Sequence, residues 1–327
     1  MCWGVCMMVV RLVGTCKART EGSRVMERRV LDVAEGRRYL YKKRGSLAVV
    51  CDQGTPEASE TLVPFDEIES VIVHTPQASY SNGAMLELAR RGIPLVCCDE
   101  THTPAAWLWP VQGNFEQGRR MMAQVALHDE LRDDLWADIV RAKLEAQAAV
   151  VRGEGFSDDV LLEFARAVLP GDRGNVEAQA ARLYWKLLFD ERFRRRRFGD
   201  EPNGLLNYGY AILRATVARQ LCAAGLHPSL GLHHHNRFNP FCLADDLMEP
   251  FRPVVDSAVI TLWQSGCEGV TAKAKSVLVA VMSESVWTER GTAPLSRCIE
   301  WTAQSLAQSV VEGKNLLCLP KGTVLVG

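Results

Sequence analysis

The hydrophobic pattern of this 327-residue chain changes its period near Gly113. From Arg29 to about Val111, short apolar runs alternate with turn residues, a pattern that is typical of β-strands. After Gly113, apolar residues recur at the three- and four-residue spacing of amphipathic helices. The sequence therefore predicts an α+β protein, with a small β-rich N-terminal domain followed by a larger all-α C-terminal domain.

The β-rich part contains a recognisable hairpin and one short helix. The segment RYLYKKRGSLAVVCD predicts two strands around a turn at residues 44–46. The segment SNGAMLELARRGIP predicts a helix that begins at the capping residues Ser81 and Asn82 and ends at Gly92. We expect the other apolar runs of this part to form further short strands.

The first 25 residues depart from the pattern that follows. The opening MCWGVCMMVVRLVG lacks a basic start, is interrupted by Arg11 and is too short to span a bilayer. A second methionine, Met26, begins a regular strand pattern. We therefore predict a dispensable extension at residues 1–25, a β-rich domain at residues 26–112 and a helical domain at residues 113–327.

Composition restricts the classes of protein that this chain can belong to. Apolar residues make up 47% and charged residues 24%, values that are ordinary for a soluble globular protein. The net charge of −1 gives no global support for nucleic-acid binding, so any such site must come from local clusters. Eleven cysteines without a C-x-x-C pair argue against a zinc ribbon or a disulfide framework, and no segment resembles a transmembrane helix. We therefore expect a protein of a reducing cytoplasm.

One stretch, GLHHHNRFNPFCLADDLMEPFRP, combines three adjacent histidines with a cluster of acids. The adjacent histidines are His233, His234 and His235. Adjacent side chains cannot all face one site, so at most one or two of the three could bind a metal. Asp246 and Glu249 are three residues apart and would share a face of a helix. Alternatively, Asp245 and Asp246 simply begin a helix that Pro250 constrains.

A further acid lies in the segment GNVEAQAARLYWKLLFDERF. Asn175 is a suitable cap, which would place Glu177 in the first turn of a helix, where its charge also complements the helix dipole. One imidazole with two or three carboxylates would suit Mg²⁺ or Mn²⁺, and the imidazole favours Mn²⁺ somewhat. Such an ion is suited to phosphodiester chemistry.

A run of four arginines, flanked by Phe193 and Phe198, follows this predicted helix. Guanidinium groups bind phosphates well, so the run is a candidate DNA-binding element. The alternative is a solvated helix C-terminus, where positive charge is favourable. The four residues are Arg194, Arg195, Arg196 and Arg197.

The segments NVEAQAARLYW, GLHPSLGLHHHNRFNPF and LADDLMEPFRPVVD resemble the CRISPR-associated adaptation integrase, the first-numbered CRISPR-associated protein, in the form that accompanies type II effectors. The N-terminal segment VIVHTPQASYSNGAMLELARRGIPLVCCDETHTPAAWL is similar to the β domain of that family. The resemblance implies a catalytic, metal-binding set made of Glu177, His234 and Glu249. It leaves Asp246 as a possible helper and gives His233 and His235 no assured role.

The resemblance also implies a function and a set of partners. We expect a divalent-metal-dependent DNA endonuclease and integrase that inserts short DNA fragments into the CRISPR repeat by transesterification, with Mg²⁺ or Mn²⁺. We expect a homodimer formed through the β-rich domain and a hetero-hexameric complex with a small second CRISPR-associated protein. The alternatives are a non-catalytic DNA-binding scaffold with a vestigial acidic cluster and a histidine-rich metal-handling protein.

Overall fold

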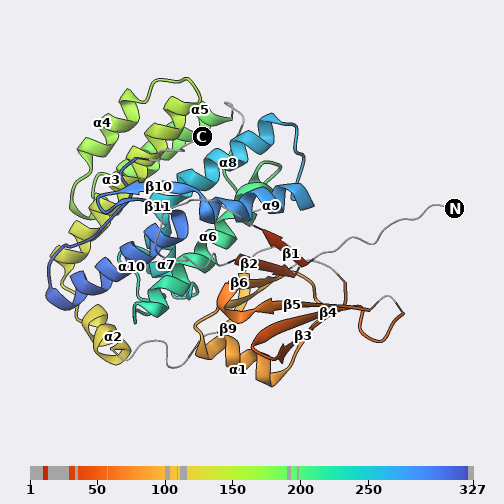
Figure 1. The fold of residues 1–327 in the computed structure, drawn as a ribbon. Coiled ribbons are helices and arrows are strands. Elements are labelled where there is room, and N and C mark those ends of the chain that lie inside the picture. Colours follow the sequence, from red (N-terminus) through yellow and green to blue (C-terminus); the bar gives the residue numbers. More distant parts are fainter. Residues whose placement is uncertain are drawn as a thin grey trace. The chain divides into compact units, whose positions relative to one another are not determined.

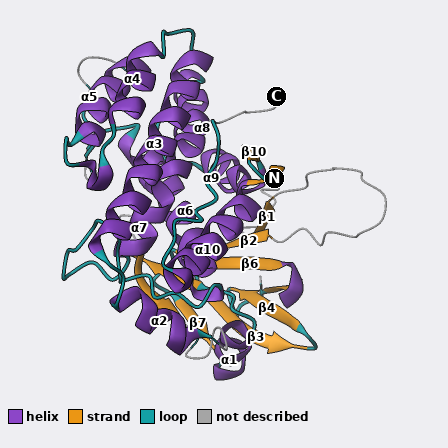
Figure 2. Ribbon diagram, turned by 90° about the vertical axis from the view of Figure 1, so that its left-hand side faces the viewer, coloured by secondary structure: helices purple, strands orange, loops and turns teal. Residues whose placement is uncertain are grey.

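The computed structural model describes residues 10–13, 29–33, 36–56, 58–99, 104–108, 110, 116–189, 193–196 and 199–322. The chain divides into two compact units, residues 1–112 and residues 113–327. Most strands belong to the first unit and nearly all helices to the second, as the colours of Figure 2 show. The predicted α+β class is therefore confirmed. Within the described ranges, no helix is both long and apolar enough to cross a membrane.

The first unit contains a five-stranded sheet and a four-stranded sheet (Figure 1). The larger sheet has the order β1 (Val10–Val13), β2 (Arg29–Val33), β6 (Ile68–Val73), β8 (Leu95–Cys98) and β9 (Pro104–Leu108). Its three central strands are parallel and its two edge strands antiparallel. The smaller sheet has the order β5 (Ser59–Pro64), β4 (Ser46–Cys51), β3 (Arg38–Lys43) and β7 (Ala78–Tyr80).

The predicted hairpin and helix of this unit are both present. Strands β3 and β4 pair through a turn in which Arg44 and Gly45 both have positive φ, at 46° and 80°, as a two-residue type I′ turn requires. Helix α1 (Asn82–Arg90) begins where the Ser81 side chain accepts a hydrogen bond from the Ala84 amide at 3.2 Å. Buried residues of both sheets and of α1 form one core, which includes Leu40, Phe65 and Leu88.

The second unit is mainly helical. Its α-helices are α2 (Gln117–Val125), α3 (Asp129–Gly153), α4 (Asp159–Ala167), α5 (Val176–Leu188), α6 (Asn203–Ala223), α7 (Cys242–Met248), α8 (Arg252–Gln264), α9 (Ala272–Ala280) and α10 (Leu295–Glu312). Short 3₁₀ turns connect some of them: η2 (Pro170–Asp172), η3 (Glu249–Phe251) and η4 (Val281–Ser283), while η1 (Phe65–Glu67) lies in the first unit between β5 and β6.

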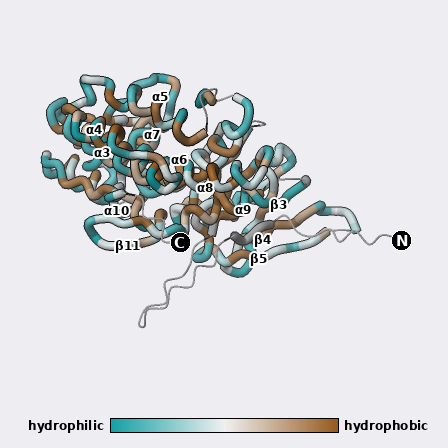
Figure 3. The backbone as a smooth tube through the Cα atoms, turned by 90° about the horizontal axis from the view of Figure 1, so that it is seen from above, coloured by the Kyte–Doolittle hydropathy of each residue, from teal (hydrophilic) through white to brown (hydrophobic). Residues whose placement is uncertain are grey.

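Helix α6 is the central element of the second unit, because it is buried on almost every side. Figure 3 shows hydrophobic stretches along α6 and α8. The two helices pack closely at Gly209, where an added Cβ would lie 2.5 Å from Cγ1 of Val255. Helix α3 contacts α4, α5, α8 and η3, and it therefore touches the elements that carry the predicted acidic residues.

Two features differ from the sequence-based expectations. Strands β10 (Ser285–Thr288) and β11 (Gly291–Pro294) form a hairpin inside the part that was expected to be entirely helical. Strand β1 lies within residues 1–25, the predicted dispensable extension, and forms an edge of the larger sheet by pairing with β2. The dispensability of those 25 residues stays a prediction.

Candidate active site

Helix α3 provides one face of the candidate site. Trp136 and Lys143 are seven residues apart, so they project from the same side of the helix two turns apart. Both are buried, with exposed fractions of 1% and 7%. Trp136 contacts the histidines of the loop before α7, whereas Lys143 contacts the carboxylates of α5 and η3.

Glu177 lies in the first turn of α5 and Asn175 at its N-cap position, both as predicted, but the capping hydrogen bonds are accepted by a different side chain. Asn175 has a left-handed backbone, with φ 49°, and its side chain makes no capping hydrogen bond, so its expected role is wrong. The carboxylate of Asp172 instead accepts hydrogen bonds from the amides of Val176 at 2.9 Å and Glu177 at 3.1 Å. Asp172 thus fixes the turn from which the Glu177 side chain reaches Lys143.

The loop before α7 is folded around the carboxylate of Asp246, which is fully buried. Its Oδ2 accepts hydrogen bonds from the amides of Leu232 at 2.6 Å and His233 at 3.1 Å, and its Oδ1 accepts one from the amide of His234 at 3.2 Å. Gly231 is required because a Cβ there would lie 2.3 Å from the carbonyl oxygen of His234. The G-x-x-H spacing therefore reflects a loop that wraps one acidic side chain.

The three histidines occupy different positions. Nδ1 of His234 lies 2.5 Å from Oδ1 of Asp246. A proton on Nδ1 leaves the lone pair of the neutral ring on Nε2, which is the arrangement of a metal-binding histidine. His233 stacks on Trp136, with ring centroids 4.4 Å apart, and His235 is exposed. The hydrogen bond to Asp246 raises the pKa of His234, although partial burial opposes the shift.

Glu249 lies in η3 and has a cation beside each of its two oxygens. Nζ of Lys143 is 2.6 Å from Oε2, and Nε of Arg252 is 2.9 Å from Oε1. Both contacts are ion pairs at short range, so each oxygen of Glu249 has its own cation. Burial alone would raise the pKa of Glu249, but the charges of Arg252 and Lys143 hold it below its ordinary value.

Lys143 joins the two acids that the sequence predicted as metal ligands. Its ammonium group donates a hydrogen bond to Oε1 of Glu177 and pairs with Glu249. Burial alone would lower the pKa of Lys143, but the charges of Glu249 and Glu177 raise it, so the ammonium form is favoured. Glu177 and Glu249 are 72 positions apart in sequence, yet one cation bridges them.

A second buried carboxylate lies beyond Arg252. The guanidinium of Arg252 is 4.6 Å from the ring centroid of Tyr210, whose hydroxyl donates to Oδ1 of Asp256 at 2.5 Å. The Tyr184 hydroxyl donates to Oδ2 of the same residue at 2.8 Å. Burial raises the pKa of Asp256 to about 6, against the opposing effect of the two tyrosine hydrogen bonds. This network joins α5, α6 and α8 next to Glu249.

Asp245, the residue before Asp246, pairs with an arginine rather than with His234. It forms a two-pronged ion pair with Arg214, at 2.6 and 2.8 Å, and accepts a hydrogen bond from Asn239 at 2.7 Å. The sequence named Asp246 rather than Asp245 as a possible helper, but it did not identify Lys143 or Arg252 at all. A signal for Lys143 was available, because it lies within the apolar face of α3 between Val140 and Leu144, where a lysine is unusual.

The donor chemistry of this cluster fits a hard divalent cation. The ammonium group of Lys143 occupies the place where a metal ion would be expected, because both Glu177 and Glu249 contact it. In the described part of the chain, however, no group of three or more histidine, cysteine or acidic side chains is arranged to hold a metal. The ligand roles of Glu177, His234 and Glu249 therefore remain a prediction, in which Lys143 would have to give way to the ion.

The arginine run follows α5 without being part of it. Residues 193–196 are not helical, so Arg194, Arg195 and Arg196 do not form a helix C-terminus, while Arg197 lies outside the described residues. Arg195 donates to Asn203 at 3.0 Å and to Asn207 at 2.8 Å, and its side chain is partly buried. Arg194 and Arg196 are exposed, so they are better placed than Arg195 to meet a phosphate.

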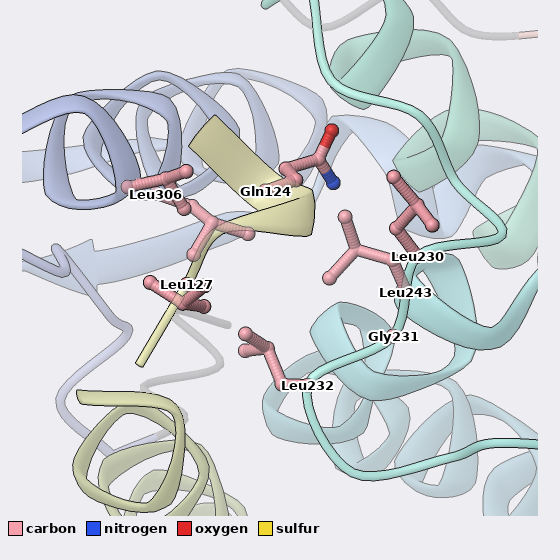
Figure 4. A pocket seen from close by; sticks show the side chains of 8 residues that line it. Gln124, Leu127, Leu230, Gly231, Leu232, Leu243 and Leu306 are labelled. Carbon is pink, nitrogen blue, oxygen red and sulfur yellow. The ribbon is translucent and has the colours of Figure 1, made fainter. Parts of the chain in front are cut away.

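A small pocket adjoins the Gly231 loop (Figure 4). Gln124 of α2 holds this region by donating to the carbonyl of His227 at 3.2 Å and accepting from its amide at 2.7 Å. The other lining residues are mainly aliphatic: Leu127, Leu230, Gly231, Leu232, Leu243, Leu306 and Val310. The pocket contains no acidic or imidazole side chain, so we interpret it as packing that supports the loop.

Known proteins share both this sequence pattern and this fold. The family model described as CRISPR associated protein Cas1 matches residues 31–271, which include Glu177, His234 and Glu249. The chain belongs to the Cas1 family. A CRISPR-associated endonuclease Cas1 from Neisseria meningitidis serogroup C is 39% identical over 206 residues, covering 62% of this chain and 67% of that protein.

Two solved structures share the fold of this chain. A casposase bound to integration product has a TM-score of 0.75 at 20% identity, covering 88% of this chain and 92% of that one. A Cas6-RT-Cas1–Cas2 complex has a TM-score of 0.71 at 18% identity, covering 91% of this chain and 36% of that one. At these identities the likeness concerns the fold. The family model and the Neisseria relative confirm the recognition of the family from the sequence.

Proposed function

We propose that this Cas1 family member is a divalent-metal-dependent DNA endonuclease and integrase of CRISPR adaptation, which inserts short DNA fragments into the repeat array in the prokaryotic cytoplasm. The observation that carries the proposal is the convergence of Glu177 and Glu249 on one cation, with His234 oriented by Asp246 nearby. The endonuclease name of the Neisseria relative and the integration product held by the casposase support it.

The proposed chemistry assigns a task to each of these side chains. Glu177, His234 and Glu249 would hold Mg²⁺ or Mn²⁺, which supplies polarisation of a phosphoryl oxygen and neutralisation of developing charge. Asp246 holds the proton on Nδ1 of His234 and thereby presents Nε2. Arg252 keeps Glu249 ionised, because its guanidinium lies beside Oε1. A DNA 3′-hydroxyl would be the nucleophile in joining, and water would replace it in cleavage.

The proposal extends to the partners. The complex of a Cas1-containing chain with Cas2 supports a small second CRISPR-associated protein as the partner of this chain. We expect a homodimer through the β-rich unit and a hetero-hexameric assembly with that partner. Size measurement of this chain alone and after mixing with the partner tests both expectations.

A strand-joining assay with the partner protein, a short duplex and a repeat-containing target tests the function, with and without Mn²⁺. We expect joining to require Mn²⁺ and to be lost in Glu177→Ala, His234→Ala and Glu249→Ala, while DNA binding is largely retained. His235→Ala and Glu163→Ala, which change exposed residues, are matched controls and should join normally. DNA binding without joining by the unmodified protein would favour the non-catalytic scaffold instead.

A further inference from the structure

The burial of the Lys143 ammonium group carries a large desolvation cost. Its side chain is 9% exposed and projects from a helix face whose neighbouring residues, such as Val140 and Leu144, are apolar and buried. Removing an ammonium group from water is costly unless anionic partners replace the lost hydration. Those partners are the two carboxylates that are proposed to hold the metal, so the role of Lys143 is tied to that site.

The charges around the two carboxylates are already balanced. Glu177 and Glu249 carry the negative charges, and Lys143 and Arg252 provide two cations in direct contact with them. These two cations weaken the attraction of the carboxylate pair for an arriving divalent ion. It must also compete with the ammonium group for the same oxygens, because Nζ of Lys143 lies between them.

We propose that Lys143 is an internal counter-cation that competes with the divalent ion for Glu177 and Glu249, so that tight metal binding requires a DNA phosphate to add negative charge. The inference rests on the proposed function and concerns how its site is regulated. Lys143 is a positioning residue here: it holds the two carboxylates together before the metal arrives and yields them when metal and phosphate are both present.

The contact with Glu249 suits a displaceable partner. Nζ of Lys143 lies 2.6 Å from Oε2 of Glu249 in an ion pair, and no backbone group of the described residues holds the ammonium at that position. Lysine ammonium is a point charge on a flexible four-carbon stem, which allows it to withdraw without moving α3. A purely structural lysine predicts the opposite outcome on replacement, since the carboxylates would then lose their alignment and bind metal more weakly.

Titration of the protein with Mn²⁺ alone, with free Mn²⁺ followed by electron paramagnetic resonance, separates these roles. We expect Lys143→Met to bind Mn²⁺ about tenfold or more tightly than the unmodified protein, because one competing positive charge is gone. We expect Lys143→Arg, which keeps the charge, to show no such gain. Lys273→Met removes an exposed lysine of α9 and controls for the change in net charge.

The same titration with a short DNA duplex present tests the coupling. In the unmodified protein, DNA should strengthen Mn²⁺ binding, and in Lys143→Met this enhancement should be several-fold smaller. Circular dichroism and thermal unfolding establish whether each variant is folded. If Lys143→Met does not fold, Lys143→Gln replaces it in the titrations. A folded Lys143→Met or Lys143→Gln protein that binds Mn²⁺ no more tightly than the unmodified protein overturns the inference.

The failure of the proposed function has a different signature. If the unmodified protein binds no Mn²⁺ even with DNA, or if binding is unaffected by Glu177→Ala and Glu249→Ala, the metal site itself is wrong. The inference then fails with it. If Mn²⁺ binding and strand joining both depend on those acids, while Lys143→Met leaves affinity and coupling unchanged, only the role of Lys143 is refuted.

Discussion

Replacing Asp246 by asparagine should destabilise the loop before α7 and change the protonation of the His234 ring. The Asp246 carboxylate accepts four hydrogen bonds, three from consecutive loop amides and one from His234 Nδ1. Asparagine has nearly the same shape but offers only one acceptor oxygen. Its amide nitrogen would therefore face donors wherever it is placed.

The magnitude follows from the number of bonds lost. If the asparagine oxygen takes the place of Oδ2, the amide and Nδ1 of His234 lose their acceptor and face the side-chain NH2 group. A hydrogen bond to a charged group contributes about 1.5–3 kcal/mol, so two of them amount to about 3–6 kcal/mol of the free energy of unfolding. We also expect Mn²⁺ affinity to fall about 10- to 100-fold, as for other groups that orient a metal-binding histidine.

Urea unfolding, Mn²⁺ titration and ¹⁵N nuclear magnetic resonance of the histidine rings together measure these effects. The unmodified protein should show the neutral His234 ring protonated at Nδ1, and Asp246→Asn should shift the proton toward Nε2. Asp245→Asn is the matched control, because Asp245 bonds Arg214 and Asn239 and makes no hydrogen bond to His234. Unchanged stability and an unchanged tautomer in Asp246→Asn would refute the assigned role of this carboxylate.

Three further predictions concern the second unit. Gly231→Ala should lower the free energy of unfolding by more than about 2 kcal/mol in urea titrations, since its Cβ would overlap the His234 carbonyl, and normal stability would contradict this. Arg196→Ala should make the slope of log binding constant against log salt concentration shallower by about one unit, with unchanged thermal stability. Arg195→Ala should instead lower thermal stability, because Arg195 bonds Asn203 and Asn207. If the two variants had the same salt slope and the same thermal stability, the different roles assigned to Arg195 and Arg196 would be refuted. The folded protein binds the Asp256 proton more tightly than the unfolded chain, because the pKa is raised from 3.8 to about 6. The stability gained from that proton is therefore present below about pH 4 and is lost, by about 3 kcal/mol, as the pH rises through 6. Urea titrations from pH 4 to 8 should show this loss in the unmodified protein and not in Asp256→Asn. Parallel pH profiles for the two proteins would contradict the prediction.

Local patterns in the sequence account for much of the fold. The Arg44–Gly45 turn, the Ser81 cap and the long apolar face of α3 are each decided by residues close together in the chain, and each is present. The β10–β11 hairpin was missed because its four-residue strands are short and lie between helical segments. The sequence also did not show that β5 and β6, which are adjacent along the chain, belong to different sheets.

The candidate site was predictable in its acids and its histidine but not in its cations. Glu177 and Glu249 were identified through family resemblance, and the structure adds that a lysine from α3 bridges them. Such a contact joins three elements that are distant in sequence, and periodicity carries no information about which helices meet. The capping of α5 was misassigned for a local reason: Asp172, the last residue of η2, lies three residues before Asn175 and accepts hydrogen bonds from the first two amides of the helix.

The Asp172 cap has a consequence for the motion of the site. Helix ends open and close more readily than helix centres, because their first amide groups lack partners within the helix. Glu177 is the second residue of α5, and its own amide is one of the two that Asp172 holds. The time that the Glu177 carboxylate spends in place is therefore governed by the fraying equilibrium of one helical turn. Hydrogen exchange at the amides of Val176 and Glu177 reports that equilibrium directly, without any metal or DNA.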